Sequence, residues 1–99
     1  MELREKELYQ EVEFYIDDTK IGSAEISMKD KMLSRFFIET EYRDKGYGTQ
    51  IVQMLKEKYG INNLWVEADN KRAIHVYEKC GFKLGEPTMF KMEIGESNV

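Results

Sequence analysis

The chain has 99 residues, of which 41% are apolar and 34% are charged, and its net charge at pH 7 is −4. This length fits one domain with one core, and the acidic balance disfavours nucleic-acid binding, because that binding depends on clustered Lys and Arg. The sequence also predicts no metal site, no membrane span, no secretory signal and no intramolecular disulfide, since Cys80 is its only cysteine, and these features favour a cytoplasmic location.

The first part of the chain predicts three strands joined by polar turns. Apolar residues alternate with polar ones from Leu8 to Ile16 and from Ile21 to Met28, which is typical of half-buried strands in an antiparallel hairpin. Asp17–Lys20 and Lys29–Lys31 are polar and turn-like. Met32–Ile38 is expected to form a third strand, and the run of apolar residues at its end indicates burial on both faces.

The second part predicts two helices separated by a short buried strand, Leu64–Val66. From Gly48 to Tyr59 the apolar residues fall on one helical face, and Gly60 is a suitable C-terminal cap. The second helix is expected to start at Asn70, whose side chain can accept hydrogen bonds from early backbone N–H groups, and to end at Gly81.

The end of the chain is expected to close the sheet. Phe82–Leu84 and Met89–Ile94 predict two closing strands, followed by a frayed tail at Glu96–Val99. The strand–helix–strand unit from Met32 to Val66 predicts a parallel strand pair with a right-handed crossover. The expected fold is a single α+β domain over residues 1–99, with a mixed, mostly antiparallel twisted sheet, one parallel β-α-β crossover and two helices packed on it.

Residues Tyr42–Thr49, with the sequence Y-R-D-K-G-Y-G-T, lie between the third strand and the first helix. The first N–H groups of a helix lack internal partners and carry partial positive charge, so they bind anions. Gly46 and Gly48 permit left-handed angles and close approach of a ligand, while Arg43 and Lys45 add positive charge. The segment indicates either a phosphate site or a turn in which glycine only relieves strain. Its residue order fits neither a Walker A loop nor a dinucleotide-binding loop.

Two motifs in this chain resemble signatures of the GNAT superfamily of N-acetyltransferases. Arg43–Gly48 matches the pyrophosphate-binding pattern R-x-x-G-x-G, and Asn70–Phe82 matches the pattern N-x-x-A-x-x-x-Y-x-x-x-G-F. The motifs occur in the family order, and the likeness extends from Phe36 to about Ile94. The resemblance implies a GNAT-like acyl-CoA N-acyltransferase fold, whose third and fourth strands diverge at their ends and admit the pantetheine arm of the coenzyme.

The resemblance also implies where acetyl-CoA, the expected co-substrate, would bind. Backbone groups at the end of the third strand would pair with pantetheine as an added strand, and loop N–H groups would bind the diphosphate. Asn70 would contact the coenzyme arm or only cap its helix, and Lys71 or Arg72 would meet the remaining phosphate or face solvent. The implied coenzyme-binding residues are Phe37, Ile38, Arg43, Asp44, Lys45, Gly46, Tyr47, Gly48, Thr49, Asn70 and Tyr77.

Direct attack of a primary amine on the thioester of acetyl-CoA requires proton transfers. Tyr77 matches the family tyrosine that lies near the coenzyme sulfur, so the resemblance implies that it protonates the leaving thiolate; the alternative is a tyrosine packed in the core. Glu39 is the residue that we assign as general base, although Glu41 and Glu67 are further candidates and no feature of the sequence separates them.

Two other reactive side chains are assigned no catalytic role. His75 falls on the polar side of its helix, away from Tyr77, and is expected to be exposed. Cys80 has no basic partner in the sequence pattern and is expected to be a small buried residue rather than an acyl-accepting nucleophile.

Only Met1–Glu7 precede the predicted hairpin, whereas family domains usually carry a strand and one or two helices there that shape one wall of the acceptor site. That wall is expected to be missing, short or supplied by the second subunit of a homodimer. An open cleft suits an amine acceptor that is a small molecule or a protein. It equally suits a non-catalytic acyl-CoA-binding or regulatory module, and a third alternative is an interaction domain that binds no coenzyme.

Overall fold

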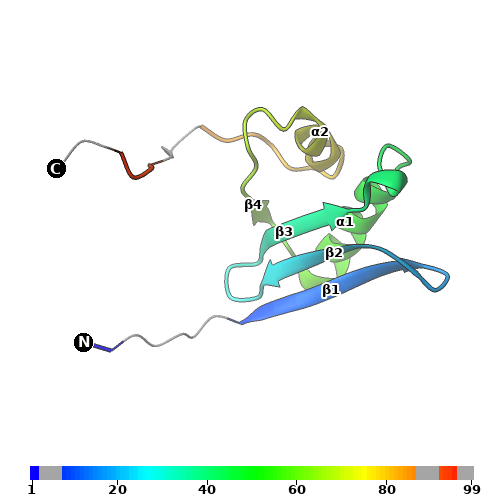
Figure 1. The fold of residues 1–99 in the computed structure, drawn as a ribbon, viewed down its shortest axis with the longest axis horizontal. Helices are drawn as coiled ribbons and strands as arrows, with labels where there is room; N and C mark the ends of the chain where they lie inside the picture. Colours follow the sequence, from blue (N-terminus) through cyan, green and yellow to red (C-terminus); the bar gives the residue numbers. More distant parts are fainter. Residues whose placement is uncertain (3–7, 87–91, 96–99) are drawn as a thin grey trace.

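A computed structural model of the chain describes residues 1–2, 8–86 and 92–95. The elements in these residues are β1 (Tyr9–Ile16), β2 (Thr19–Ser27), β3 (Met32–Ile38), the 3₁₀ helix η1 (Thr40–Tyr42), α1 (Tyr47–Tyr59), β4 (Asn63–Leu64) and α2 (Lys71–Lys79), as Figure 1 shows. The strands form one sheet in the order β1-β2-β3-β4, in which β1 to β3 are antiparallel and β4 is parallel to β3. The predicted α+β class, with a mixed sheet and two helices, is confirmed.

Two antiparallel hairpins form most of the sheet, as the alternating pattern predicted. The pairing of β1 with β2 runs from Tyr9 opposite Ser27 to Ile16 opposite Thr19. The turn between these strands places Asp17 at a φ of 53°, a left-handed conformation that Asp tolerates better than most residues. β2 begins at Thr19, before the predicted start, because the strand pairing continues down to this tight turn.

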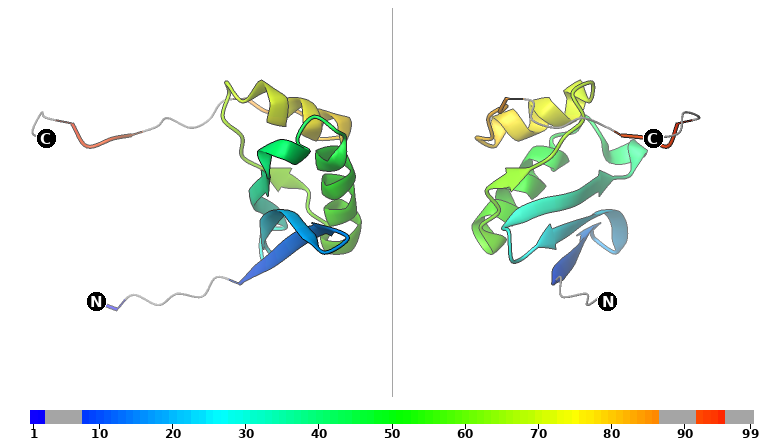
Figure 2. Two further views of the ribbon diagram at one scale, coloured as in Figure 1. Left: turned by 45° about the vertical axis from the view of Figure 1, so that its right-hand side comes forward. Right: turned by 90° about the vertical axis from the view of Figure 1, so that its left-hand side faces the viewer.

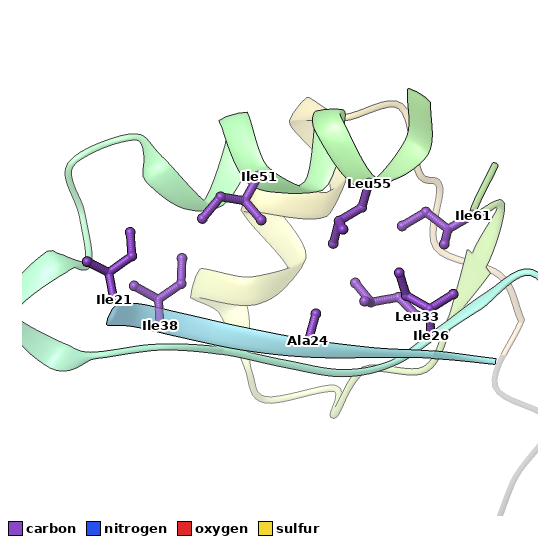
Figure 3. Close-up of a cluster of buried hydrophobic side chains, with 8 residues drawn as sticks. All are labelled: Ile21, Ala24, Ile26, Leu33, Ile38, Ile51, Leu55 and Ile61. Atoms are coloured by element: carbon purple, nitrogen blue, oxygen red, sulfur yellow. The ribbon is translucent and has the colours of Figure 1, made fainter. Parts of the chain in front are cut away.

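The core lies between α1 and one face of the sheet (Figures 2 and 3). The amphipathic pattern of α1 turns Ile51 and Leu55 toward the sheet, and Gly60, at a φ of 68°, forms the predicted C-terminal cap. Full burial of one such side chain contributes about 1.5–3 kcal/mol, so these residues hold the helix on the sheet. The buried core residues are Ile21, Ala24, Ile26, Leu33, Ile38, Ile51, Leu55 and Ile61.

β3 and β4 diverge soon after they meet. Their pairing consists of Met32 with Asn63 and Leu33 with Leu64. Beyond this point the part of β3 from residue 35 to residue 38 has no strand beside it on that edge, within the residues that the structure describes. The divergence that the family resemblance implied is therefore present, and it leaves this edge of β3 without a partner strand in the described part of the chain, although the Ile38 carbonyl oxygen accepts a hydrogen bond from the Arg43 Nε.

α2 lies beyond β3, on the side of the sheet away from β1 and next to α1 (Figure 1). At its N-terminus the Asn70 Oδ1 accepts a hydrogen bond from the Ala73 N–H at 3.2 Å, which confirms the predicted cap. At its C-terminus the Lys56 ammonium donates to the Cys80 carbonyl oxygen, and the Cys80 thiol donates to the Thr49 carbonyl oxygen at 3.4 Å. Both of these partners belong to α1, so the end of α2 is fastened to that helix.

Replacing Lys56 by Met is expected to lower the free energy of unfolding by about 1–2 kcal/mol, because the bond from an ammonium to a carbonyl at a helix C-terminus is charge-assisted. The ammonium also lies 5.8 Å from the centroid of the Phe82 ring. Lys58→Met, which removes the same charge from an exposed position of α1, should change stability by less than about 0.5 kcal/mol. Equal midpoints of urea unfolding for the two variants would show that Lys56 does not fasten α2.

Two strand predictions in the second part of the chain are wrong. β4 ends at Leu64, and Trp65, which was expected to be buried in this strand, is 64% exposed. Phe82–Leu84 forms no strand, because the Phe82 N–H donates to the Tyr77 carbonyl oxygen at 3.0 Å and closes the end of α2 instead of joining the sheet.

The predicted strand Met89–Ile94 falls mostly outside the described residues. Met92 and Ile94 are described, form no strand and are exposed. The predicted tail at Glu96–Val99 lies outside the described residues entirely.

Candidate functional site

The loop between η1 and α1 is folded back onto the end of β3. The Arg43 Nε donates to the Ile38 carbonyl oxygen at 2.7 Å, and the guanidinium lies 5.3 Å from the centroid of the Phe37 ring. Gly46 precedes α1 at a φ of 86°, a left-handed conformation that strains a residue carrying a Cβ. The arginine therefore fixes the loop on the strand, and the glycine turns the chain into the helix.

At the N-terminus of α1, the first backbone N–H groups come before the first hydrogen bond of the helix. The first such bond of the helix runs from the Gln50 N–H to the Gly46 carbonyl oxygen at 3.2 Å. The N–H groups of Tyr47, Gly48 and Thr49 come before it and have no acceptor inside the helix. Because the helix dipole adds partial positive charge at the same end, this geometry suits an anion.

Gly48 is the point at which α1, α2 and β3 come together. A Cβ at this position would lie 3.5 Å from the Val76 Cγ1 and 3.6 Å from the Ile38 Cδ1. The close approach brings the loop, the end of the strand and the second helix around one space.

A cavity of about 900 Å³ occupies that space, between the end of β3, the loop and α2. This volume lies within the range of roughly 300–1,000 Å³ that is typical of small-molecule sites. Many of the predicted site residues line it together. They are Phe37, Ile38, Arg43, Asp44, Gly46, Gly48, Thr49, Asn70 and Tyr77.

Three predicted site residues are not among those that line this cavity. The Lys45 ammonium lies 5.8 Å from the centroid of the Tyr42 ring, and Tyr47 is half-buried against the core with its ring 6.3 Å from that of Tyr42. Glu39 directly follows β3, where its N–H donates to the Ile21 carbonyl oxygen at 2.7 Å and its side chain is exposed. The functional roles of these residues stay predictions.

Tyr77 lines this cavity and also a second cavity, of about 910 Å³, between β4 and the segment that follows α2. Its ring packs against Phe36 and Phe82, with centroid separations of 6.4 and 6.2 Å. Burial raises the pKa of its phenol above the ordinary value of 10.0. The hydroxyl therefore keeps its proton at neutral pH. The surroundings are compatible with both predicted roles, a proton donor at a cavity wall and a packed aromatic ring.

Polar side chains on one face of α2 also line the cavity, among them Lys71, for which the resemblance implied either a phosphate contact or a solvent-facing position. Lys71, His75 and Lys79 line it and are spaced four residues apart, so they share one helical face. The predicted exposure of His75 is confirmed. The Arg72 Nη2 lies 3.2 Å from the Asp44 Oδ2, which joins the first turn of α2 to the loop. The regular spacing was visible in the sequence, whereas this ion pair joins two separate segments.

Cys80 is 3% exposed, which confirms its predicted buried position. Burial raises the pKa of its thiol, and the Lys56 ammonium opposes that shift only in part. A thiol held in its protonated form is a poor nucleophile, so the site gains nothing from this residue chemically.

The described part of the chain contains no group of His, Cys, Asp and Glu side chains that could hold a metal ion. None of the helices in that part is both long enough and apolar enough to cross a membrane.

The chain matches the protein-family model described as the acetyltransferase (GNAT) family over residues 2–82. This span covers most of the chain and includes both motifs, the loop at Arg43–Gly48 and the helix at Asn70–Phe82. A search of curated proteins finds no match to the chain.

Proposed function

This chain belongs to the GNAT family of acetyltransferases, and we propose that it moves an acetyl group from acetyl-CoA to a primary amine. The observation that carries the proposal is the position of the α1 N-terminus. Gly48 and Thr49, whose N–H groups have no acceptor inside the helix, line the same cavity as Tyr77. One extended molecule with an anionic end and a reactive end would occupy both places.

The residues present fit the coenzyme. The N–H groups at the start of α1 suit a diphosphate, and the Arg43 guanidinium, which lines the cavity, adds positive charge beside them. The edge of β3 beyond Leu33 has no strand beside it among the described residues, so amide groups of a pantetheine arm could pair with it as an added strand. In our proposal the sulfur of a coenzyme bound in this way lies beside Tyr77, which lines the same cavity.

Acetyl-CoA supplies a thioester whose carbonyl carbon accepts the amine nitrogen, so a C–N bond forms as the C–S bond breaks. In our proposal the Tyr77 hydroxyl gives its proton to the sulfur that leaves. The raised pKa of this phenol keeps the proton available across the neutral and mildly alkaline range.

The attacking amine must lose a proton, because an alkylammonium with a pKa near 10.4 has no lone pair. We propose that Glu39, which follows β3 directly, accepts this proton. Because its carboxylate does not line the cavity, a bridging water carries the proton to it. The nitrogen loses a second proton as the amide forms, and that proton replaces the one that Tyr77 gives to the sulfur. The proton taken up by Glu39 passes to solvent, so each turnover that starts from an ammonium releases one proton. A homodimer and a cytoplasmic location complete the proposal for the chain.

Calorimetry with coenzyme A, followed by release of free thiol from acetyl-CoA over a panel of amines, tests this function. We expect saturable binding that raises the melting temperature, since a ligand bound only to the native state stabilises it. Pantetheine, which lacks the diphosphate, should bind at least about tenfold more weakly. Binding without turnover for any amine would leave a non-catalytic acyl-CoA-binding module, and the absence of binding would overturn the proposal.

A further inference from the structure

One ion pair joins two residues that line the cavity in which the proposed function puts phosphate. The Arg72 guanidinium on α2 reaches the Asp44 carboxylate in the loop, with 3.2 Å between Nη2 and Oδ2. Both side chains line the cavity, and more than half of each is exposed, at 59% and 67%. Asp44 lies in the loop and Arg72 in the first turn of α2, so the pair joins these two segments at the cavity.

The carboxylate of Asp44 occupies a place that otherwise favours anions. It lies in the loop that leads into the N–H groups of α1, and Arg43 beside it is basic. A negative group at this position repels a phosphate and at the same time holds the guanidinium that suits phosphate best. Arg72 forms the same kind of charge-assisted bond with a carboxylate or with a phosphate, so the two anions compete for it.

We propose that Asp44 is a built-in competitor of the coenzyme phosphate, which holds Arg72 when the site is free and yields it when coenzyme A binds. The inference rests on the proposed function and concerns its regulation. Asp44 thereby sets how tightly the nucleotide end is held and how readily free coenzyme A leaves after transfer. Lys71 and Lys79 also line the cavity, and Asp69 is the second acidic residue of its lining. Among the described ion pairs, Arg72 is the basic lining residue that has a carboxylate partner.

Asp44→Asn is the variant that isolates this effect. Asp44 has a φ of 60°, and Asn tolerates this left-handed conformation as well as Asp does, so the loop should keep its shape. An exposed ion pair contributes little to folding, so the variant should melt like the parent. Glu13→Gln is the matched control. It removes the same charge from another exposed pair, in which the Glu13 Oε2 lies 2.7 Å from the Lys20 Nζ on the β1–β2 hairpin.

Calorimetric titration with coenzyme A compares the parent, the control, Asp44→Asn, Arg72→Gln and the double variant. Asp44→Asn should bind about 5- to 10-fold more tightly than the parent, because repulsion is removed and Arg72 is released. Arg72→Gln should bind more weakly, and adding Asp44→Asn to it should restore part of the loss. Glu13→Gln should match the parent.

The outcomes separate this inference from the function on which it rests. If the parent binds coenzyme A and Asp44→Asn binds no more tightly than Glu13→Gln, the competition is refuted and the proposed function stands. If Asp44→Asn binds more weakly than the parent, Asp44 is a ligand of the coenzyme and not a competitor. If the parent does not bind coenzyme A at all, both proposals fall together.

Discussion

Replacing Tyr77 by Phe is expected to lower kcat for acetyl transfer by about 10²- to 10⁴-fold, because the leaving thiolate loses its proton donor. The ring of Tyr77 packs against Phe36 and Phe82, and a phenylalanine ring keeps those contacts. The affinity for coenzyme A should therefore change little, since the substitution removes an interaction made only as the C–S bond breaks. Steady-state kinetics with a reactive amine, together with calorimetry, separates the two quantities.

Tyr59→Phe provides the matched control for this variant. Tyr59 is also a half-buried tyrosine on a helix, but it does not line the cavity. It should retain the kcat of the parent. Equal values of kcat for Tyr77→Phe and Tyr59→Phe would remove Tyr77 from the chemistry and leave it as a core residue.

The Tyr77 hydroxyl also makes the free energy of unfolding depend on pH, and the raised pKa of this phenol gives the direction of the dependence. Burial raises the pKa of Tyr77 in the folded state above its ordinary value of 10.0. Above pH 10.0 the unfolded phenol loses its proton first, so the folded state binds more protons and the free energy of unfolding falls as pH rises toward the folded pKa. Tyr77→Phe should lack this contribution to the alkaline loss.

The substitution Gly22→Ala is expected to reduce the free energy of unfolding by about 3 kcal/mol. A Cβ at this buried position of β2 would lie 2.2 Å from the Phe37 carbonyl oxygen and 3.1 Å from the Ile38 Cα. These are backbone atoms of β3, so no side chain can rotate to make room. The strand must shift, and it is the strand that forms one wall of the cavity.

Urea and thermal unfolding measure this change, and the midpoint temperature should fall by roughly 12–24 °C for a domain of this size. Gly85→Ala is the control, because a Cβ there would meet no atom within 4 Å and the residue does not need a positive φ. Its midpoint should stay close to that of the parent. If Gly22→Ala unfolds at the same midpoint as Gly85→Ala, the close approach of β2 and β3 at this point is not as described.

The hairpins, α1 and the cap of α2 could be predicted from the sequence because local chemistry determines them. Alternation placed β1 and β2, an apolar run placed β3, one apolar face placed α1, and Asn70 caps α2 through its own side chain. The expected burial of β3 on both faces is wrong at Phe37, which is 47% exposed. The family motifs likewise located the loop and the helix that form the cavity.

The wrong strand predictions arose at apolar residues, because an apolar residue can lie in a buried strand, at the end of a helix or on the surface. Trp65 and Phe82 both suggested buried strands, yet Trp65 is 64% exposed and the Phe82 N–H closes the end of α2. The Arg43 bond to the Ile38 carbonyl and the Asp44–Arg72 ion pair also escaped prediction. Each of these contacts depends on how the loop folds in space, which no spacing in the sequence encodes.

A crystal structure of the chain with coenzyme A tests the central claim most directly. We expect oxygen atoms of the diphosphate within about 3 Å of the backbone nitrogens of Tyr47, Gly48 and Thr49, and the sulfur beside the hydroxyl of Tyr77. A diphosphate bound elsewhere, or a sulfur that lies away from Tyr77, would contradict the account.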